Sequence, residues 1–383
     1  MKNKYTLIAI LFCLTYLSAE PYIAVRTGYK CSQCHVNRTG GGKRTGFGFV
    51  YSQTNLPTFL AVSKQNSGLF TNRINEFISI GSNFRVGNKT IMGTDSTRNL
   101  VGEEKDPKNN NSIIIPEANV YLEISAIPDK LLFYIDENFA PGASNREAFA
   151  MVYNLPLNSY VKFGRIMMPF GLRLMDDGSD GSYVRQKTGF NSYGKQETAF
   201  EFGIEPGPFS FITAIGNGQD ASSMDKQITS VGSVVYRRFR LGASLSYNKG
   251  EEFTDVTTGF FAGGYHGIFT WMFEKDFVTI KDADGNGLSW FGKYEDAGDQ
   301  SMTYLSLDMR LYRGVNLKVS WDQWDPMVKW ETEERDRWTF GLELFPIQYL
   351  QTSIFYRYRT APDLEIYNAD NEDQVYFEMH FFF

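Results

Sequence analysis

Two cysteines and a histidine near the N-terminus stand at a spacing that could support redox chemistry. The run reads Cys31-Ser32-Gln33-Cys34-His35. Cysteines three residues apart can each form a thioether to one vinyl group of the same porphyrin, and the next side chain then lies under the iron. We therefore expect Cys31 and Cys34 to hold one covalent haem c, with His35 as the proximal ligand of the iron.

Two further chemistries use a Cys-x-x-Cys pair. The chain has three cysteines, and Cys13 lies in a segment that we expect to be cleaved, so both remaining thiols belong to the motif. A zinc site needs four ligands, and only His266 and His380 remain as imidazoles elsewhere. A redox dithiol is typical of a strand-to-helix junction, whereas Gly- and Arg-rich sequence flanks this pair. The pattern favours haem attachment over zinc binding and over dithiol chemistry.

Residues 1–19 have the features of a secretory signal peptide. Lys2 and Lys4 precede an apolar run from Leu7 to Leu17, and cleavage is expected after Ala19. The run is too short to cross a bilayer as a helix, and no later stretch approaches eighteen apolar residues. We expect export, and entry into a membrane only as strands.

The C-terminal residues 375–383 alternate with a period of two. Their odd-numbered positions are apolar, and Tyr376, Glu378, His380 and Phe382 form the other face. An alternating strand that ends in Phe resembles the insertion signal of Gram-negative outer-membrane barrels. A buried terminal strand of a soluble sheet is the alternative.

The composition favours a membrane barrel. Aromatic residues make up 16% of the chain, with 22 Tyr and 32 Phe, although the mean hydropathy is −0.32. Aromatic girdles and a polar lumen would produce this combination. The net charge is −6, and losing two signal-peptide lysines makes it more negative, so nucleic acid is not expected as a partner.

From about residue 74 onward, apolar and polar residues alternate in short runs, such as Leu305-Leu307-Met309 against Ser306-Asp308-Arg310. Very short turns alternate with longer polar connections near 87–112, 168–196, 217–227, 282–300, 325–335 and 360–372. This pattern predicts an all-β fold, a transmembrane antiparallel β-barrel of about 16 strands with both ends on the periplasmic, short-turn side. We expect the segment around Gly164–Gly171 to be a packed surface loop, with a constriction of the pore as the alternative.

Residues 20–73 lack sustained periodicity and cannot bury a sizeable core alone. We expect them to form a small haem-carrying plug in the lumen or its periplasmic mouth, so the predicted division is 1–19 signal peptide, 20–73 monohaem cytochrome c segment and 74–383 barrel. The run Gly40-Gly41-Gly42 permits a tight turn beside the porphyrin. Candidates to pair with the haem propionates, with simple solvation as the alternative for each, are Arg26, Lys30, Arg38, Lys43 and Arg44.

The sixth ligand of the iron is left open. Alternation directs both His380 and His266 into the lumen near the plug, where either imidazole could reach the iron. One of the twelve methionines could bind there instead, or the position could be empty. Haem depth, the direction of electron flow and the oligomeric state are also left open.

With these features together, the chain resembles the fused outer-membrane cytochrome–porins, which carry a monohaem segment before a barrel of roughly sixteen strands. The order Pro21, Ala24, Arg26, Thr27-Gly28 before the motif is similar to members that oxidise extracellular ferrous iron. The Gly-Gly-Gly after it is closer to uncharacterised relatives. The resemblance implies ferrous iron oxidation as one activity, with electron transfer alone as the alternative.

Three functions follow from this sequence. The first is a Gram-negative outer-membrane protein that transfers electrons between an extracellular metal ion or redox carrier and a periplasmic cytochrome or other electron carrier. The second is a diffusion porin whose covalent haem is structural or sensory, with a solute path lined by Asp308, Arg310, Lys318, Asp322, Arg357 and Arg359. The third is a soluble periplasmic cytochrome with an all-β domain. Outer-membrane lipid is a partner in the first two.

Overall fold

The computed structural model describes residues 21–60, 71–93, 97–98, 104–105, 109–142, 146–172, 182–188, 190, 196–218, 226–250, 253–282, 284–285, 287–289, 292–293, 299–328, 334–360 and 372–383. The predicted signal peptide lies outside the described residues, as do parts of the longer predicted loops.

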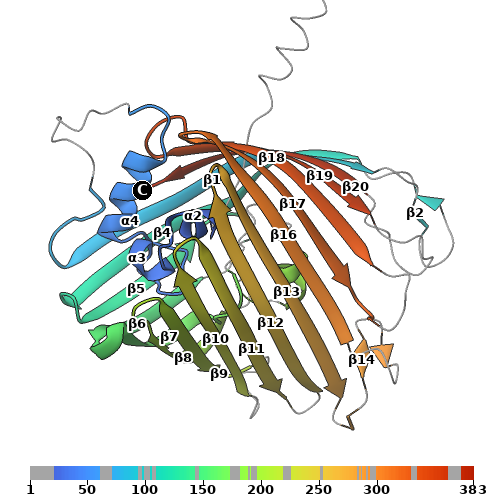
Figure 1. Ribbon diagram of the computed structural model, residues 1–383, viewed down its shortest axis with the longest axis horizontal. Coiled ribbons are helices and arrows are strands. Elements are labelled where there is room, and N and C mark those ends of the chain that lie inside the picture. The colour runs from blue at the N-terminus through green and yellow to red at the C-terminus, as the bar shows by residue number, and fades with distance from the viewer. Residues whose placement is uncertain are drawn as a thin grey trace, which may run out of the picture.

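Sixteen antiparallel strands close into one barrel (Figure 1). The strands are β1 (Ile78–Gly93), β4 (Asn110–Ile127), β5 (Leu131–Asn138), β6 (Glu147–Leu155), β7 (Ser159–Met167), β8 (Gln196–Ile204), β9 (Phe209–Gly216), β10 (Lys226–Tyr236), β11 (Phe239–Lys249), β12 (Phe253–His266), β13 (Phe269–Asp282), β16 (Asp299–Tyr312), β17 (Val315–Asp325), β18 (Arg335–Leu344), β19 (Leu350–Thr360) and β20 (Glu372–Phe382). Each pairs with its neighbours in sequence, and β1 pairs with β20 to close the ring. The predicted fold class and strand number are confirmed.

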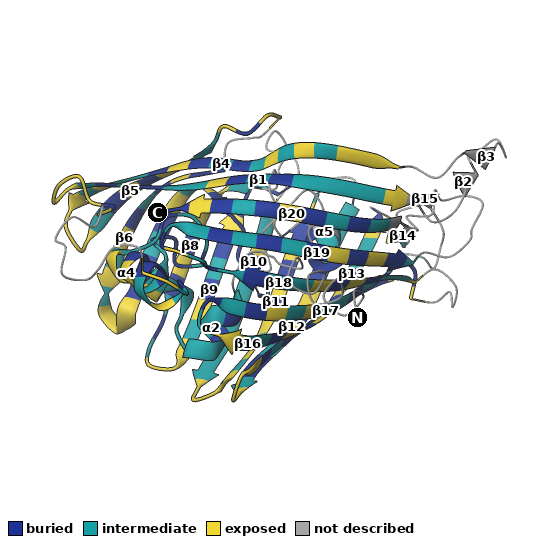
Figure 2. Ribbon diagram, turned by 90° about the horizontal axis from the view of Figure 1, so that it is seen from above, coloured by how far each residue is buried: buried dark blue, intermediate teal, exposed yellow. Residues whose placement is uncertain are grey.

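Alternating side chains explain why these segments form barrel strands. Along β20, Glu378 and His380 are buried, whereas Phe377 and Phe381 are 36% and 40% exposed on the outside. Figure 2 shows the same alternation of buried and more exposed positions along β19 and β20. The two faces predicted for residues 375–383 are therefore confirmed.

The outer wall is apolar. Phe163, Phe200, Leu241, Phe260 and Phe340 all project from strands and are exposed. A soluble monomer rarely leaves so much contiguous apolar surface in water. A closed barrel has no unpaired strand edges, so its backbone polar groups are satisfied in lipid. The protein is thus an outer-membrane barrel with lipid around it.

Short hairpin turns gather at one end of the barrel. They connect β4 to β5, β6 to β7, β8 to β9, β10 to β11, β12 to β13, β16 to β17 and β18 to β19. Several use a left-handed residue, for example Asp129, Gly267 and Gly314. In barrels of this kind the short-turn end usually faces the periplasm. The barrel also begins and finishes at this end, since the start of β1 and the end of β20 lie there.

Two predicted loop boundaries differ from the structure. The predicted loop 87–112 includes strand, because β1 continues to Gly93 and β4 begins at Asn110. Polar residues can still pair as strands beyond the lipid band, and here Asn88 donates to Asn111 across the pair. On the same side, only residues 250–252 separate β11 from β12, so one of the connections on the long-loop side is short.

The N-terminal segment lies inside the short-turn end (Figure 1). It contains α2 (Pro21–Thr27), α3 (Cys31–Cys34) and α4 (Gly46–Asn55). Lys30 Nζ donates to the backbone oxygens of Glu205 and Phe209 at the β8–β9 turn. Arg313, in the β16–β17 turn, donates to Thr54 O. We call residues 21–55 the plug, and its position agrees with the predicted periplasmic mouth.

The connection between β7 and β8 folds into the barrel. Its helix α5 (Tyr183–Thr188) packs on β13, β16 and β17, on the opposite wall. Val184 and Arg185 are fully or almost fully buried. The packed surface loop expected around Gly164–Gly171 was wrong, because residues up to Met167 belong to β7 and the chain then turns inward. Phe170 and Leu172 are buried, and Leu172 N donates to Glu274 on β13.

Four short strands and one helical turn complete the described elements. They are β2 (Thr97–Arg98), β3 (Glu104–Lys105), β14 (Leu288–Ser289), β15 (Gly292–Lys293) and the 3-10 turn η1 (Pro156–Asn158). None of the helices in the described residues is long and apolar enough to cross a membrane.

Candidate cofactor site

The two cysteines form a single helical turn, α3. Lys30 precedes it, and the backbone N–H of Lys30 donates to Gln33 Oε1 at 2.9 Å, which holds the start of the turn. At the other end, His35 N donates to Cys31 O at 2.9 Å. Residues three apart on a helix are surface neighbours. Cys31 and Cys34 therefore share one side of α3, as attachment to a single porphyrin requires.

The chain after His35 turns back on itself. Val36 N donates to Lys43 O, and Thr45 N donates to Cys34 O, both at 3.0 Å. Between them, Gly40, Gly41 and Gly42 have φ angles of 98°, 71° and 64°. Residues with side chains rarely adopt this conformation. The tight turn predicted for the glycine run is present, and its backbone lines the same cavity as the motif.

Helix α4 crosses directly over α3. Thr45 caps α4 by accepting from Gly48 N. A Cβ placed on Gly48 would overlap the carbonyl group of Cys34, whereas one on Gly46 would have nothing within 4 Å. Only a glycine at position 48 permits this approach of the two helices, so α4 forms a close support behind the cysteine pair.

Cys31, Cys34 and His35 all open onto one cavity in the periplasmic half of the lumen. The cavity has a volume of about 260 Å³ and opens to solvent. Its apolar wall includes Ile212, Val231, Phe261, Phe345 and Phe382. Pockets for small ligands usually have mainly apolar walls. Two thiols and an imidazole facing a largely apolar cavity match the donor set that the predicted haem needs.

Of the five predicted propionate partners, three reach this cavity. Lys30, Arg38 and Arg44 line it. Arg26 bonds instead to Thr270 and Asn316. Lys43 forms an ion pair with Glu123 at 2.8 Å. These last two cations are therefore used to dock the plug on the barrel wall.

The sequence analysis missed three arginines of the cavity, Arg85, Arg146 and Arg240. Arg240 donates to Tyr29 O at 2.9 Å, and its buried Nε has no hydrogen-bond partner in the described residues. The alternation of β11 could have identified Arg240, since Phe239 and Leu241 point outward and are more than half exposed.

Burial controls the ionisation of the plug residues. Burial and, to a lesser extent, the nearby Cys31 raise the pKa of the Cys34 thiol to about 11, and Arg44 opposes the shift. Burial lowers the pKa of Lys30, although Glu205 opposes this. An anionic group in the cavity would compensate the desolvated ammonium of Lys30.

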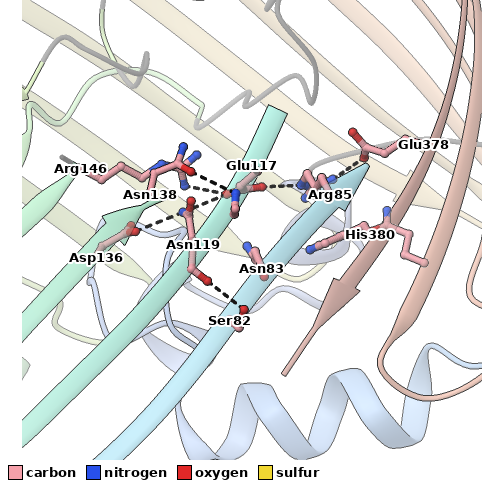
Figure 3. A network of polar contacts seen from close by, with 12 residues as sticks. Ser82, Asn83, Arg85, Glu117, Asn119, Asp136, Asn138, Arg146, Glu378 and His380 are labelled. Carbon is pink, nitrogen blue, oxygen red and sulfur yellow. Dashed lines mark hydrogen bonds and ion pairs between the residues drawn. The ribbon is translucent and has the colours of Figure 1, made fainter. Parts of the chain in front are cut away.

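An ion-pair network holds the seam where β1 meets its neighbours (Figure 3). Arg85 donates to Glu117 at 2.5 Å and to Glu378 at 2.7 Å. Arg146 completes it by donating to Glu117 at 2.6 Å. Removing one partner of a buried pair typically costs about 3–5 kcal/mol. This network fixes β20, and with it His380, beside the cavity.

The two histidines considered for the sixth ligand have different surroundings. His380 is only 2% exposed and lines the cavity. His266 is exposed at the end of β12 and does not line the cavity, so its expected inward orientation was wrong. Along β12, Thr257, Gly259 and Phe261 are buried whereas Thr258 and Phe260 are exposed, so alternation within its own strand places His266 on the outer face. No methionine of the described residues lines the cavity.

Most of the charged residues that the sequence analysis placed along a solute path are buried. Asp322 pairs with Arg337 at 2.8 Å, and Asp308 approaches Lys318 at 3.7 Å. From α5, Arg185 donates to Glu274 at 2.5 Å. The first two pairs join neighbouring strands of the wall, whereas Arg185 and Glu274 join α5 to the wall. In the part of the chain that the structure describes, α5 and the plug therefore fill much of the interior.

Comparisons with known proteins identify the fold. No protein-family model and no curated protein matches the chain. Among solved structures, OmpT of Vibrio cholerae matches with a TM-score of 0.60 at 10% identity, covering 80% of this chain and 99% of that one. An anion-selective porin from Comamonas acidovorans gives 0.58 at 9%, covering 80% and 99%. Salmonella typhi OmpF, in complex with daunomycin, gives 0.57 at 11%, covering 82% and 100%. The barrel thus has the outer-membrane porin fold.

Proposed function

We propose that the protein is an outer-membrane monohaem c-type cytochrome in a porin-like barrel, and that it transfers electrons between an extracellular donor or acceptor and a periplasmic carrier. The observation that carries this proposal is the cavity onto which Cys31, Cys34 and His35 all open. A bound haem would supply a one-electron Fe(III)/Fe(II) couple. Ferrous iron is the extracellular substrate that the sequence resemblance suggests.

The residues of the plug would hold the group in a defined way. Cys31 and Cys34 would each hold the haem through a thioether, formed by addition of the S–H across one vinyl group, which takes up the proton and needs no oxidant. His35 follows directly at the end of α3. Lys30, Arg44 and Arg240 line the cavity and would neutralise the two propionates, whereas Arg38 already pairs with Glu205 at 3.2 Å.

The depth of the cavity restricts what can react there. Strands such as β12 and β13 contain 14 residues each, so a barrel with strands tilted by ~40° is roughly 35 Å tall. The plug contacts the short turns, at one end of that height. A periplasmic protein can approach this end directly, whereas an external donor must be small enough to enter the lumen.

Side-specific reduction tests the proposal. The purified protein is reconstituted into liposomes with its long loops outward, and ferrous iron is added outside only. A rapid change in the haem absorbance supports exchange with the exterior. A haem that responds to dithionite only after detergent opening contradicts it.

The second candidate is a diffusion porin whose covalent haem is structural or sensory. The porin fold favours this candidate, because the similar structures include an anion-selective porin, and the comparisons support it better than they support electron transfer. The buried ion pairs around α5 oppose it. Conductance in a planar bilayer separates the two candidates, since an open porin passes a steady ion current and a filled barrel passes little.

A further inference from the structure

His380 has one ring nitrogen fixed and the other without a partner. Its Nδ1 lies 2.6 Å from Gln351 Oε1 on the neighbouring strand β19. Its Nε2 is buried and has no hydrogen-bond partner in the described residues. A buried polar atom without a partner costs about 1–3 kcal/mol. Native structures retain such an atom where a ligand or ion satisfies it.

The orientation of Gln351 determines where the imidazole proton lies. Gln351 Nε2 donates to Glu343 Oε1 at 3.2 Å, so its Oε1 faces His380. The opposite orientation would point Oε1 at a carboxylate. Because Oε1 can only accept, Nδ1 of His380 must carry the proton. In the neutral ring, Nε2 then holds a free electron pair.

The carboxylate of Glu343 has three further partners. It accepts from Asn316 at 2.6 Å and from the hydroxyl of Tyr22 in α2, and Lys318 lies 3.3 Å away. Metal-binding imidazoles commonly donate their second N–H to such an outer partner, which fixes the ring and its tautomer. Glu343, Gln351 and His380 thus form a chain of the kind that orients a metal ligand.

The free nitrogen belongs to the cavity of the cysteine motif. His35 and His380 both line it, from the plug and from β20 respectively. His35 follows the cysteines directly and His380 comes from the barrel wall, so the cavity receives one imidazole from the plug and one from the barrel. His266 and the methionines do not line this cavity in the described part of the chain.

We propose that His380 Nε2 is the sixth ligand of the haem iron, and that Gln351 is the positioning residue that fixes its tautomer. This inference rests on the proposed haem site. It makes the barrel wall part of the redox centre, since His35 comes from the plug and His380 from the last strand. Bis-histidine ligation would also close the iron to exogenous ligands.

The test uses the full-length, haem-loaded protein in detergent. Wild type should be six-coordinate low-spin, and its ferrous form should not bind carbon monoxide. His380→Ala should lose the low-spin spectrum and bind carbon monoxide, and added imidazole should restore the low-spin form. The matched control is His266→Ala, which should keep the wild-type spectrum. Gln351→Leu should show a mixture of spin states.

Two results overturn the ligand assignment: carbon monoxide binding by wild type, or a low-spin spectrum retained in His380→Ala. If His380→Ala does not fold, as judged by heat-modifiable gel mobility, the reduction potential of His380→Met is measured instead. A raised reduction potential supports the assignment, because His/Met ligation raises it, and an unchanged potential overturns it. A wild-type chain without covalent haem on a denaturing gel overturns the proposed function instead.

Discussion

At the scale of single residues, the site depends on a close contact between two helices as well as on the residues that would bind the haem. The prediction of the cysteine pair and His35 as the haem site rests on their spacing alone, because the attachment chemistry requires that spacing. Gly48 could not, since nothing in a sequence reveals that its Cα faces the carbonyl of Cys34. The contact between α4 and α3 therefore restricts the residue type at position 48 as strictly as haem attachment restricts the cysteine spacing.

Gly48→Ala should reduce haem attachment while leaving the barrel intact. The new methyl group would push α4 away from α3, and overpacking of this kind costs about 1–3 kcal/mol, or a factor of roughly 5–150 in the population of the competent arrangement. The measurement is covalent haem per folded protein, with heat-modifiable mobility as the check on folding. Gly46→Ala is the matched control because its Cβ meets nothing. Equal haem content in the two variants would contradict this role for Gly48.

Lys43 gives a pH dependence to plug docking. Burial lowers the pKa of Lys43 below its ordinary value of 10.5, although Glu123 opposes the shift and Arg73 adds to it. The docked plug therefore binds fewer protons than the free one, so docking should strengthen as pH rises through the window below 10.5. The slope is at most about 1.4 kcal/mol per pH unit.

Protection of the plug against an alkali-stable protease between pH 8 and 10 measures this dependence. Lys43→Met should reduce the slope, because only Lys30, whose pKa burial also lowers, then contributes a dependence of the same sign. Lys226→Met, at an exposed position on β10, is the control and should keep the wild-type slope. Protection that falls with rising pH in wild type would reverse the sign and reject the explanation.

At the scale of elements, the strands could be predicted and the inward-folded loop could not. A period of two records which face of a strand meets lipid, so β16, β17, β18 and β20 follow directly from alternation. The position of α5 depends on contacts such as Arg185 with Glu274, which are 89 residues apart. A polar loop sequence carries no sign of such a contact.

Arg185→Ala should open the lumen. The guanidinium donates to Glu274 at 2.5 Å and to Leu172 O at 2.6 Å, so its loss leaves Glu274 and Asp276 buried together and releases α5 from the wall. Breaking a buried pair costs about 3–5 kcal/mol. In planar bilayers we expect single-channel conductance to rise from near zero to a level typical of an open pore. Arg165→Ala, an exposed arginine on β7, should leave conductance unchanged. A conductive wild type would instead favour the diffusion porin.

At the scale of the whole molecule, the cavity lies at the periplasmic end and α5 lies between it and the long-loop side. The depth of the cavity that would hold the haem, which the sequence left open, follows from the contacts of the plug with the short turns. Length and composition could not supply it, because a plug of this size could lie at either end of the lumen. Because the cavity lies near one end of the barrel and α5 lies on its other side, small and large redox partners should differ in the side from which they can reach it.

Redox partners of graded size should reveal this asymmetry. In oriented liposomes, a soluble c-type cytochrome should exchange electrons only from the short-turn side, because roughly 35 Å of barrel separates the two ends. Hydrated ferrous iron is small enough to enter the lumen and should react from the long-loop side as well. Stopped-flow absorbance of the haem, with each reagent added to one side, measures both rates. Arg185→Ala should accelerate only the reaction of iron from the long-loop side, since α5 no longer fills the path. Electron exchange with the soluble cytochrome from the long-loop side would show instead that the cavity opens to the exterior.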